Sequence, residues 1–559
     1  MERFTTAERG VGRDAVSLLN HPRVVPEHAL AALVVAVLCA WPVSVKAQDT
    51  LQAVSCQRTT PVAISGLSYD RMRMEELEPG AAIQSQFVRR NSTFKLQLCP
   101  RTAPDLEFAI LPAHLQSSWS QGYPIDRNNG ALWGGRGIAA AVTAGVELRI
   151  GVLTAAVSPT ATFQENQSFE LKPVDLPGYT RLINAAHPQT IDWPQRFGFA
   201  SYATIDPGQS YVRVDMRPVS LGISHENIWI GPSLRTPLLL SNTAGGFPHL
   251  FITANPIGTP IGRIGIDALW GRLAESEYFD GDESNDHRLL SGITVELQPR
   301  GVPGLFLGAS RLYTSSMRDR DVLELLGRPY GFSGDDQLRQ IEDNALFAAF
   351  VRYVLPGVGA EVWAEWGHEN GFAELWDLVS EPDQTQAYVI GFQKLTPVGS
   401  RTLAVYAELV HLESPLPLRR GRGAVTFYTH GSIRQGHTHK GQVLGAWIGP
   451  GSDAQMIALD WMGQRSSTGF YLERARFDTD AYLDQWAVYY GHNGHDAQLA
   501  LGARHDRQLG PLQLALDASY ANRYNRNFLR LDGTVPGELV SESNLRLDLE
   551  VIWRPTNNR

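Results

Sequence analysis

Cysteine, basic charge and long apolar runs are all scarce in this sequence. Only three cysteines occur among 559 residues, which excludes a small scaffold held together by several disulfides. The net charge of −9 is mixed in sign along the chain. A nucleic-acid partner would require a basic stripe, so none is expected. After the N-terminal region, no run of about 18 apolar residues predicts a transmembrane helix.

The signatures of soluble enzymes are missing as well. There is no Gly-x-Ser-x-Gly elbow, no Walker glycine loop and no dinucleotide-binding fingerprint. Ser224-His225 and His505-Asp506 place polar partners beside a histidine, but such pairs are expected by chance in a chain with 15 histidines. We therefore predict neither an enzyme nor a bound cofactor.

The N-terminus predicts export. Residues 29–41 form an apolar run that is too short to span a membrane. Val45-Lys46-Ala47 follows as a small-residue cleavage pattern. We expect residues 1–47 to be a signal peptide and Gln48 to be the first mature residue. The stretch before the apolar run is long and includes acidic side chains, which favours a start codon assigned too far upstream.

The segment that follows, residues 48–127, is polar, irregular and contains proline. It holds Cys56 and Cys99, which we expect to form a disulfide in the oxidising periplasm. Two unrelated free thiols are the alternative. We predict that this segment is a small periplasmic or lumen-plugging domain.

From about residue 128 to the end, apolar and polar residues alternate. In one stretch, Val142, Ala144, Val146, Leu148 and Ile150 alternate with Thr143, Gly145, Glu147 and Arg149. This period predicts strands with one apolar and one polar face. Charged residues such as Arg213 and Asp215 fall in mid-strand, where a packed soluble core would exclude them but a wet lumen would not.

The ends of the predicted strands and the last strand favour a membrane barrel over a soluble sandwich. Aromatic residues near strand ends, including Trp363 and Trp461, suit interfacial girdles. Residues 544–553 form a long amphipathic strand, which a barrel needs because an open edge in lipid leaves backbone groups unpaired. We predict an all-β fold in which residues 128–559 form one antiparallel barrel in outer-membrane lipid.

Three histidines lie close together at His430, His437 and His439. A His-x-His pair on a strand puts both imidazoles on one face, which is half of a metal site. No carboxylate or cysteine is placed to complete such a site, and Lys440 follows at once. We therefore expect no metal.

Two segments carry a more specific signal. The first contains Trp229-Ile230-Gly231-Pro232, then Leu240-Ser241-Asn242 and Pro248. The second runs from Tyr428 to Asp453 and contains Gly436-His437-Thr438-His439-Lys440-Gly441. Together they resemble the Wzi family of capsule-assembly outer-membrane proteins. That family has a Trp-Gly-Pro element followed by Leu-Ser-Asn and a proline, and later a glycine-bounded element with two tyrosines. Here the first element is longer by one residue, and His437 and His439 stand where tyrosines are common.

The resemblance covers residues 128–553 and implies a barrel of about 18 strands in the bacterial outer membrane. It further implies that the barrel binds capsular or other surface polysaccharide and helps retain it at the cell surface, without catalysis. We expect a monomeric barrel. The residues that the resemblance nominates for glycan binding or for the motif itself are Trp229, Gly231, Pro232, Arg235, Ser241, Asn242, Tyr428, His430, His437 and His439. Turn formation and strand packing are the alternative role for the motif residues.

Two other functions stay open. The same barrel with an unobstructed lumen would be an outer-membrane channel for small solutes, and lumen charge would serve either role. A barrel enzyme that acts on lipid or polysaccharide is a third possibility, but no catalytic motif in the sequence supports it.

Overall fold

A computed structural model describes most of the chain beyond its N-terminal region. The described residues are 64–78, 81, 83, 87–92, 106–216, 218–317, 343–369, 385–415, 426–491, 493–531 and 539–555. The predicted signal peptide, Cys56 and Cys99 lie outside these residues, so the cleavage site and the disulfide stay predictions. No helix within the described residues is long and apolar enough to cross a membrane.

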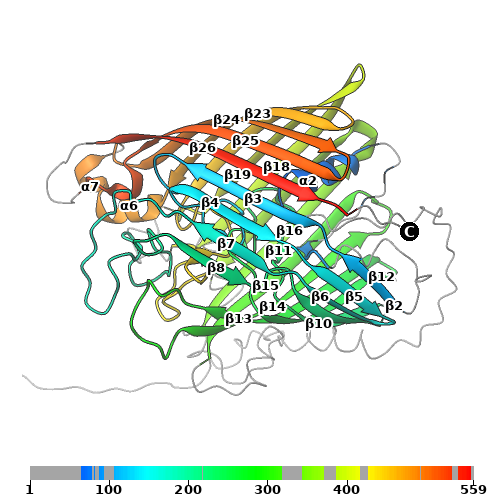
Figure 1. Cartoon of the computed structure of the whole chain (residues 1–559), viewed down its shortest axis with the longest axis horizontal. Coiled ribbons are helices and arrows are strands. Elements are labelled where there is room, and N and C mark those ends of the chain that lie inside the picture. The colour runs from blue at the N-terminus through cyan, green and yellow to red at the C-terminus, as the bar shows by residue number, and fades with distance from the viewer. Residues whose placement is uncertain are drawn as a thin grey trace, which may run out of the picture.

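Antiparallel strands form a tilted barrel wall (Figure 1). In chain order they are β2 (Leu106–Ile110), β3 (Ala113–Ser120), β4 (Gly137–Thr143), β5 (Val146–Ile150), β6 (Leu153–Val157), β7 (Thr160–Gln164), β8 (Tyr202–Asp206), β9 (Tyr211–Asp215), β10 (Val219–Ser224), β12 (His249–Thr259), β13 (Gly262–Ala274), β14 (His287–Pro299), β15 (Leu305–Ser316), β16 (Asn344–Leu355), β17 (Ala360–Glu369), β18 (Gln386–Val398), β19 (Arg401–His411), β22 (Asp453–Met462), β23 (Ser466–Phe477), β24 (Asp496–Leu509), β25 (Leu512–Tyr524) and β26 (Ser541–Trp553). The last strand, β26, pairs with β3 and so closes the circuit.

The number of strands agrees with the expected architecture. The described wall has 22 segments, and four consecutive pairs of them are the halves of one interrupted strand, which leaves 18 strands. The interrupted strands are β2–β3, β4–β5, β6–β7 and β8–β9. The predicted all-β antiparallel barrel is therefore confirmed.

The four interruptions lie side by side and form a line that we call the crease. Pairing of β3 with β4 ends at His114 opposite Thr143, and pairing of β2 with β5 resumes at Ile110 opposite Val146. Each break contains a residue that weakens a ladder, namely Pro112, Gly145, Pro159 and Gly208. At Gly145 a side chain would collide with the Val157 carbonyl on the next strand.

The barrel begins before the expected boundary at residue 128, and the crease explains why the first strand was not recognised from the sequence. The first wall strand starts at Leu106, and its outward residues Leu106, Phe108 and Ile110 are 63%, 64% and 53% exposed. Because Leu111-Pro112 interrupts the alternation, each half is too short to be recognised from its period alone. The boundary set at residue 128 was wrong, and residues 106–127 belong to the barrel and its first loop.

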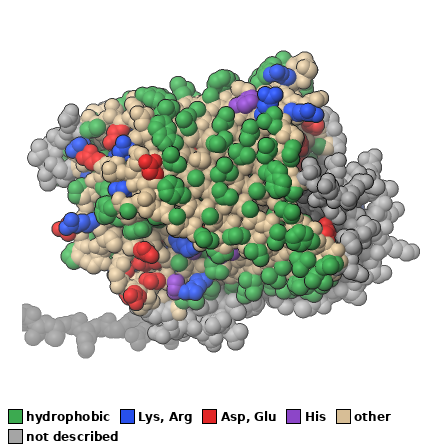
Figure 2. All heavy atoms as spheres, in the orientation of Figure 1, with side chains coloured by type: hydrophobic (Ala, Val, Ile, Leu, Met, Phe, Trp, Pro, Cys, Tyr) green, Lys and Arg blue, Asp and Glu red, His purple; other side chains and the backbone are tan. Residues whose placement is uncertain are grey.

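The two faces of the wall differ as the alternation predicted. Outward residues such as Leu148 and Leu501 are exposed, whereas Arg213 and Asp267 are buried in the lumen. Figure 2 shows hydrophobic side chains spread over the strands on the face in view, with most charged side chains near its margins. Trp363 differs from the expected girdle position. It points inward in the middle of β17, and its indole N–H donates to Glu408.

Loop lengths orient the barrel. Short turns join the strands at one end, as where Gly510-Pro511 links β24 to β25. Long loops join them at the other end, including residues 121–136, 165–201 and 478–495, the last of which holds helices α6 (Thr479–Gln485) and α7 (Ala487–Tyr490). Outer-membrane barrels place their short turns in the periplasm and their long loops outside the cell. We call the long-loop end the outer end.

Three segments fill the lumen. The plug segment, described at residues 64–78, 81, 83 and 87–92, contains helix α2 (Leu67–Glu75) and strand β1 (Val88–Arg89). The first inner loop, residues 225–248, contains β11 (Trp229–Ile230), which pairs with β1. The second inner loop is described at residues 426–452 and contains β20 (Thr438–His439) and β21 (Gln442–Val443). Most residues of the two loops are buried.

Candidate functional site

The structure brings the two motif segments together, because they are the two inner loops and pack against each other. The Tyr428 hydroxyl donates to the Leu238 carbonyl at 2.6 Å, and the His437 Nε2 donates to the Leu239 carbonyl at 2.6 Å. The Ser241 hydroxyl donates to the Gly445 carbonyl at 2.7 Å. Tyr428 and His437 also stack, with ring centroids 5.3 Å apart. The motif residues therefore join two distant loops inside the lumen.

Two carboxylates of the wall hold the first inner loop. Glu365 on β17 accepts from the N–H groups of Ser233 at 2.9 Å and Leu238 at 3.0 Å. Glu408 on β19 accepts from three successive N–H groups, those of Leu234, Arg235 and Thr236. A loop that offers its backbone donors to buried carboxylates satisfies both partners.

Gly231 and Pro232 fit this cradle. Gly231 has a φ of 116°, and a side chain there would collide with the Glu365 carboxylate. The Pro232 carbonyl accepts from the Arg73 guanidinium of the plug segment at 2.9 Å. The Gly-Pro step thus lets the loop approach the wall on one side and the plug on the other.

Trp229 lies between the plug and the first inner loop. Its side chain is 0% exposed, and the Arg89 guanidinium lies over its ring at 4.3 Å from the centroid. Full burial leaves no ring face for a sugar, so the structure favours the alternative role of packing for Trp229.

The three histidines are each held by backbone groups. The His430 Nδ1 accepts from the Ile433 N–H at 2.9 Å, and the His439 Nδ1 accepts from the Ala274 N–H at 3.0 Å. Burial lowers the pKa of His430 and of His437 to about 4, which keeps both rings uncharged at neutral pH. Among the described residues, no group of three or more His, Cys, Asp or Glu side chains is arranged to hold a metal ion.

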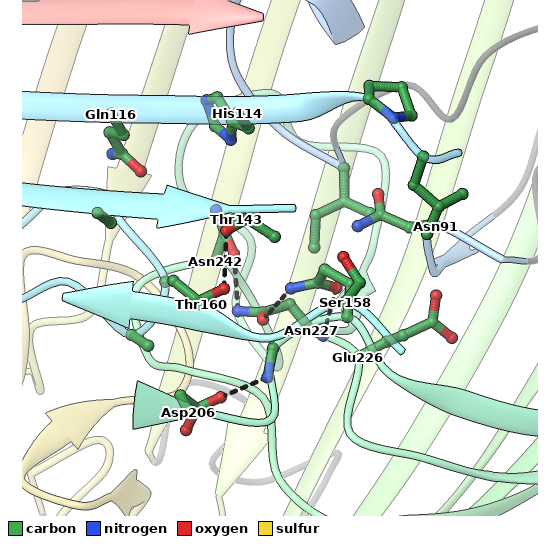
Figure 3. A pocket seen from close by; sticks show the side chains of 18 of the residues that line it. Asn91, His114, Gln116, Thr143, Ser158, Thr160, Asp206, Glu226, Asn227 and Asn242 are labelled. Carbon is green, nitrogen blue, oxygen red and sulfur yellow. Dashed lines mark hydrogen bonds between the residues drawn. The ribbon is translucent and has the colours of Figure 1, made fainter. Parts of the chain in front are cut away.

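Of the nominated residues, Arg235 and Asn242 reach an open space in the lumen. Two adjoining cavities share His114, Gln116, Asn129 and Asn242 in their walls, and we call them together the inner chamber. Figure 3 shows His114, Gln116 and Thr143 of the wall facing Asn227 and Asn242 of the first inner loop. Arg235 lines the chamber and is paired with Asp70 of α2.

Buried ion pairs fasten the plug segment, and sequence reasoning missed them. Glu361 on β17 lies 2.8 Å from Arg73 of α2 and 2.6 Å from Arg352 of β16. Arg352 also pairs with Glu76 at 2.7 Å. The Arg90 guanidinium contacts the Asp267 carboxylate of β13 through two hydrogen bonds. The available signal was the charge in mid-strand, which predicted a polar lumen but not its partners.

Comparison with known proteins gives one family. The model of the family described as capsule assembly protein Wzi matches residues 115–535. Among solved structures, Wzi of Escherichia coli, an outer-membrane carbohydrate-binding β-barrel involved in group 1 capsule assembly, superposes with a TM-score of 0.51. It is 12% identical, and the match covers 79% of this chain and 85% of that one. At this identity the likeness concerns the fold.

Porin structures match with lower scores. OccAB1 of Acinetobacter baumannii superposes with a TM-score of 0.38 at 10% identity, over 80% of this chain and 96% of that one. A BenF-like porin of Pseudomonas fluorescens gives 0.39 at 9% identity, over 80% and 98%. A search of curated proteins finds no match.

Proposed function

Because the chain belongs to the capsule assembly protein Wzi family, we propose that this outer-membrane barrel binds capsular or other surface polysaccharide and helps retain it at the cell surface. It acts as a monomer and without catalysis. The family match carries the proposal, since residues 115–535 include both inner loops and nearly the whole wall. The Escherichia coli neighbour, a carbohydrate-binding barrel, supports the same ligand class.

The filled lumen favours holding a glycan over conducting solutes. The plug segment and both inner loops occupy the interior, and they are fixed to the wall through Glu361, Glu365 and Glu408. A channel for small solutes would need a continuous wet path through this region. We therefore expect the purified protein to show no large steady openings in planar bilayers.

Deletion of the gene tests the function directly. We expect cells without the protein to make and export polysaccharide as before but to lose it to the medium, so that the cell-bound fraction falls and the soluble fraction rises. The measurement is polysaccharide in washed cells and in culture supernatant, with the intact gene on a plasmid as the control. Unchanged cell-bound polysaccharide together with lost uptake of a small solute would establish the channel instead.

A further inference from the structure

A separate cavity lies at the outer end of the barrel, among the long loops. Its wall includes three tryptophans, each from a different loop: Trp133 after β3, Trp193 between β7 and β8, and Trp447 of the second inner loop. Phe477 and Asp496, which end β23 and begin β24, form its floor at the rim of the wall. We call it the outer cavity. It faces the side on which surface polysaccharide lies.

The three indoles are held differently. Trp133 and Trp447 are nearly buried. The ring of Trp133 lies 4.9 Å from that of Phe197, and the Arg127 guanidinium lies 4.4 Å from the ring centroid of Trp447. Trp193 is only partly buried. Its ring packs against Gly449, where a side chain would collide with the indole. Trp193 is thus a rigid aromatic surface on which a ligand could stack.

The polar groups around these rings include unused donors. Asn184 accepts from the N–H groups of Ala186 at 2.9 Å and His187 at 2.8 Å through its amide oxygen. Asn527 accepts from Arg523 through its own amide oxygen. Within the described part of the chain, neither amide nitrogen has a partner. An aromatic face beside a few placed amide donors is the composition of a site for a small polar ligand.

Both arginines of the cavity are already paired with carboxylates. Arg523 makes two hydrogen bonds of 2.7 Å to the Asp496 carboxylate, and Arg526 pairs with Glu542. Asp478 pairs with His187 at 2.9 Å. An acidic sugar would need a guanidinium or ammonium free to meet its carboxylate. Among the described lining residues both arginines are committed elsewhere, so the cavity suits an uncharged ring.

We propose that the outer cavity binds uncharged pyranose units of the surface polysaccharide. The C–H face of the sugar stacks on Trp193, and the sugar hydroxyls accept from the amides of Asn184 and Asn527. This inference rests on the proposed function and names its site and sugar class. Trp447 also lines the inner chamber, so the stacked Arg127 and Trp447 separate the bound sugar from the lumen.

The experiment uses the full-length barrel in detergent and surface polysaccharide purified from cells that carry the gene. One sample is left native, and in a second sample the uronic acids are reduced to neutral sugars. Trp193→Ala removes the stacking face, and Ala185→Trp fills the cavity without removing an aromatic ring. Trp461→Ala is the matched control, because Trp461 lies on the outward face near the short-turn end.

We expect Trp193→Ala and Ala185→Trp each to weaken binding about tenfold or more, as truncating or blocking a central anchor does. Trp461→Ala should change the affinity less than about twofold, and carboxyl reduction should leave wild-type affinity unchanged on the same scale. Heat-modifiable gel mobility verifies that each variant is folded.

Each other result overturns a defined part of the inference. Wild-type affinity in both cavity variants would remove the site but leave polysaccharide binding intact. Loss of binding on carboxyl reduction would overturn the sugar class. A wild-type barrel that binds neither sample would contradict the proposed function itself.

Discussion

The plug region and the outer cavity use polar groups in opposite ways. In the plug region, buried guanidinium groups and carboxylates satisfy one another, as in the group of Arg73, Glu361 and Arg352. In the outer cavity the two arginines are also paired, but a partly exposed indole and two amide nitrogens are left unused. A network of buried ion pairs fixes one conformation, whereas unused donors beside an aromatic face leave room for a ligand. The difference separates the part that seals the barrel from the part that binds.

The largest expected effect comes from Glu361→Gln, which removes a carboxylate that holds the plug segment in the lumen. Glu361 is 0% exposed and contacts two arginines, one of which also pairs with Glu76, so its loss leaves one buried positive charge uncompensated. Removing one partner of a buried pair costs about 3–5 kcal/mol. We expect the plug segment to become sensitive to protease and the barrel to show steady openings in planar bilayers.

A pair on the surface provides the control for that experiment. Arg530 and Glu170 form a salt bridge at 2.9 Å with side chains 52% and 47% exposed. Glu170→Gln should leave conductance and protease resistance unchanged, because exposed pairs contribute little. A sealed and protease-resistant Glu361→Gln barrel would show that the plug is held by other contacts.

Trp229→Ala sharpens the comparison between the two regions. Removing a fully buried indole leaves a void, and such truncations cost about 3–5 kcal/mol. We expect a lower midpoint of urea unfolding and an affinity for polysaccharide within about twofold of wild type, since no ring face is accessible. Reduced affinity in a barrel of normal stability would restore Trp229 as a sugar-contacting residue.

The smallest effect is a pH dependence set by the second inner loop. Burial lowers the pKa of His430 and His437 from 6.5 to about 4. Between these values the unfolded chain binds more protons than the folded one, so stability falls as the pH drops through 6.5 and levels off near 4. The loss is roughly 1–2 kcal/mol per histidine between pH 7 and pH 5.

His437→Gln checks this sign. The glutamine amide can still donate to the Leu239 carbonyl but does not titrate in this range. The thermal midpoint of the variant should depend less on pH between 7 and 5 than that of the wild type. A steeper dependence in the variant would mean that His437 is protonated in the folded barrel.

Alternation and the two motif segments were enough to predict the fold, the family and the outer-membrane location. Strands such as β26 can be predicted from their own sequence, because one face contacts lipid and the other faces a polar lumen, which makes apolar and polar residues alternate. The match over residues 115–535 confirms the family that Gly231-Pro232 and Ser241-Asn242 suggested.

The rest depended on contacts between distant parts of the chain. Arg73 and Glu361 are 288 positions apart in the sequence, and no local pattern selects that partner. The amino-acid sequence does not distinguish the roles of Trp229 and Trp193. In the structure, Trp229 is enclosed by the plug, whereas Trp193 borders a cavity. The crease was missed because alternation continues from Val142 to Ile150, so the period does not mark the break at Gly145.

Closure of the wall between β3 and β26 imposes an order on biogenesis. The seam joins Ala113 to Trp553, so it cannot form until nearly the whole chain has been made and delivered. The plug segment precedes every wall strand and is fastened by ion pairs to β13, β16, β17 and β24. A segment enclosed in this way must already lie inside the curved sheet when β26 pairs with β3. The slow, long-range step of folding is then also the one that traps the plug.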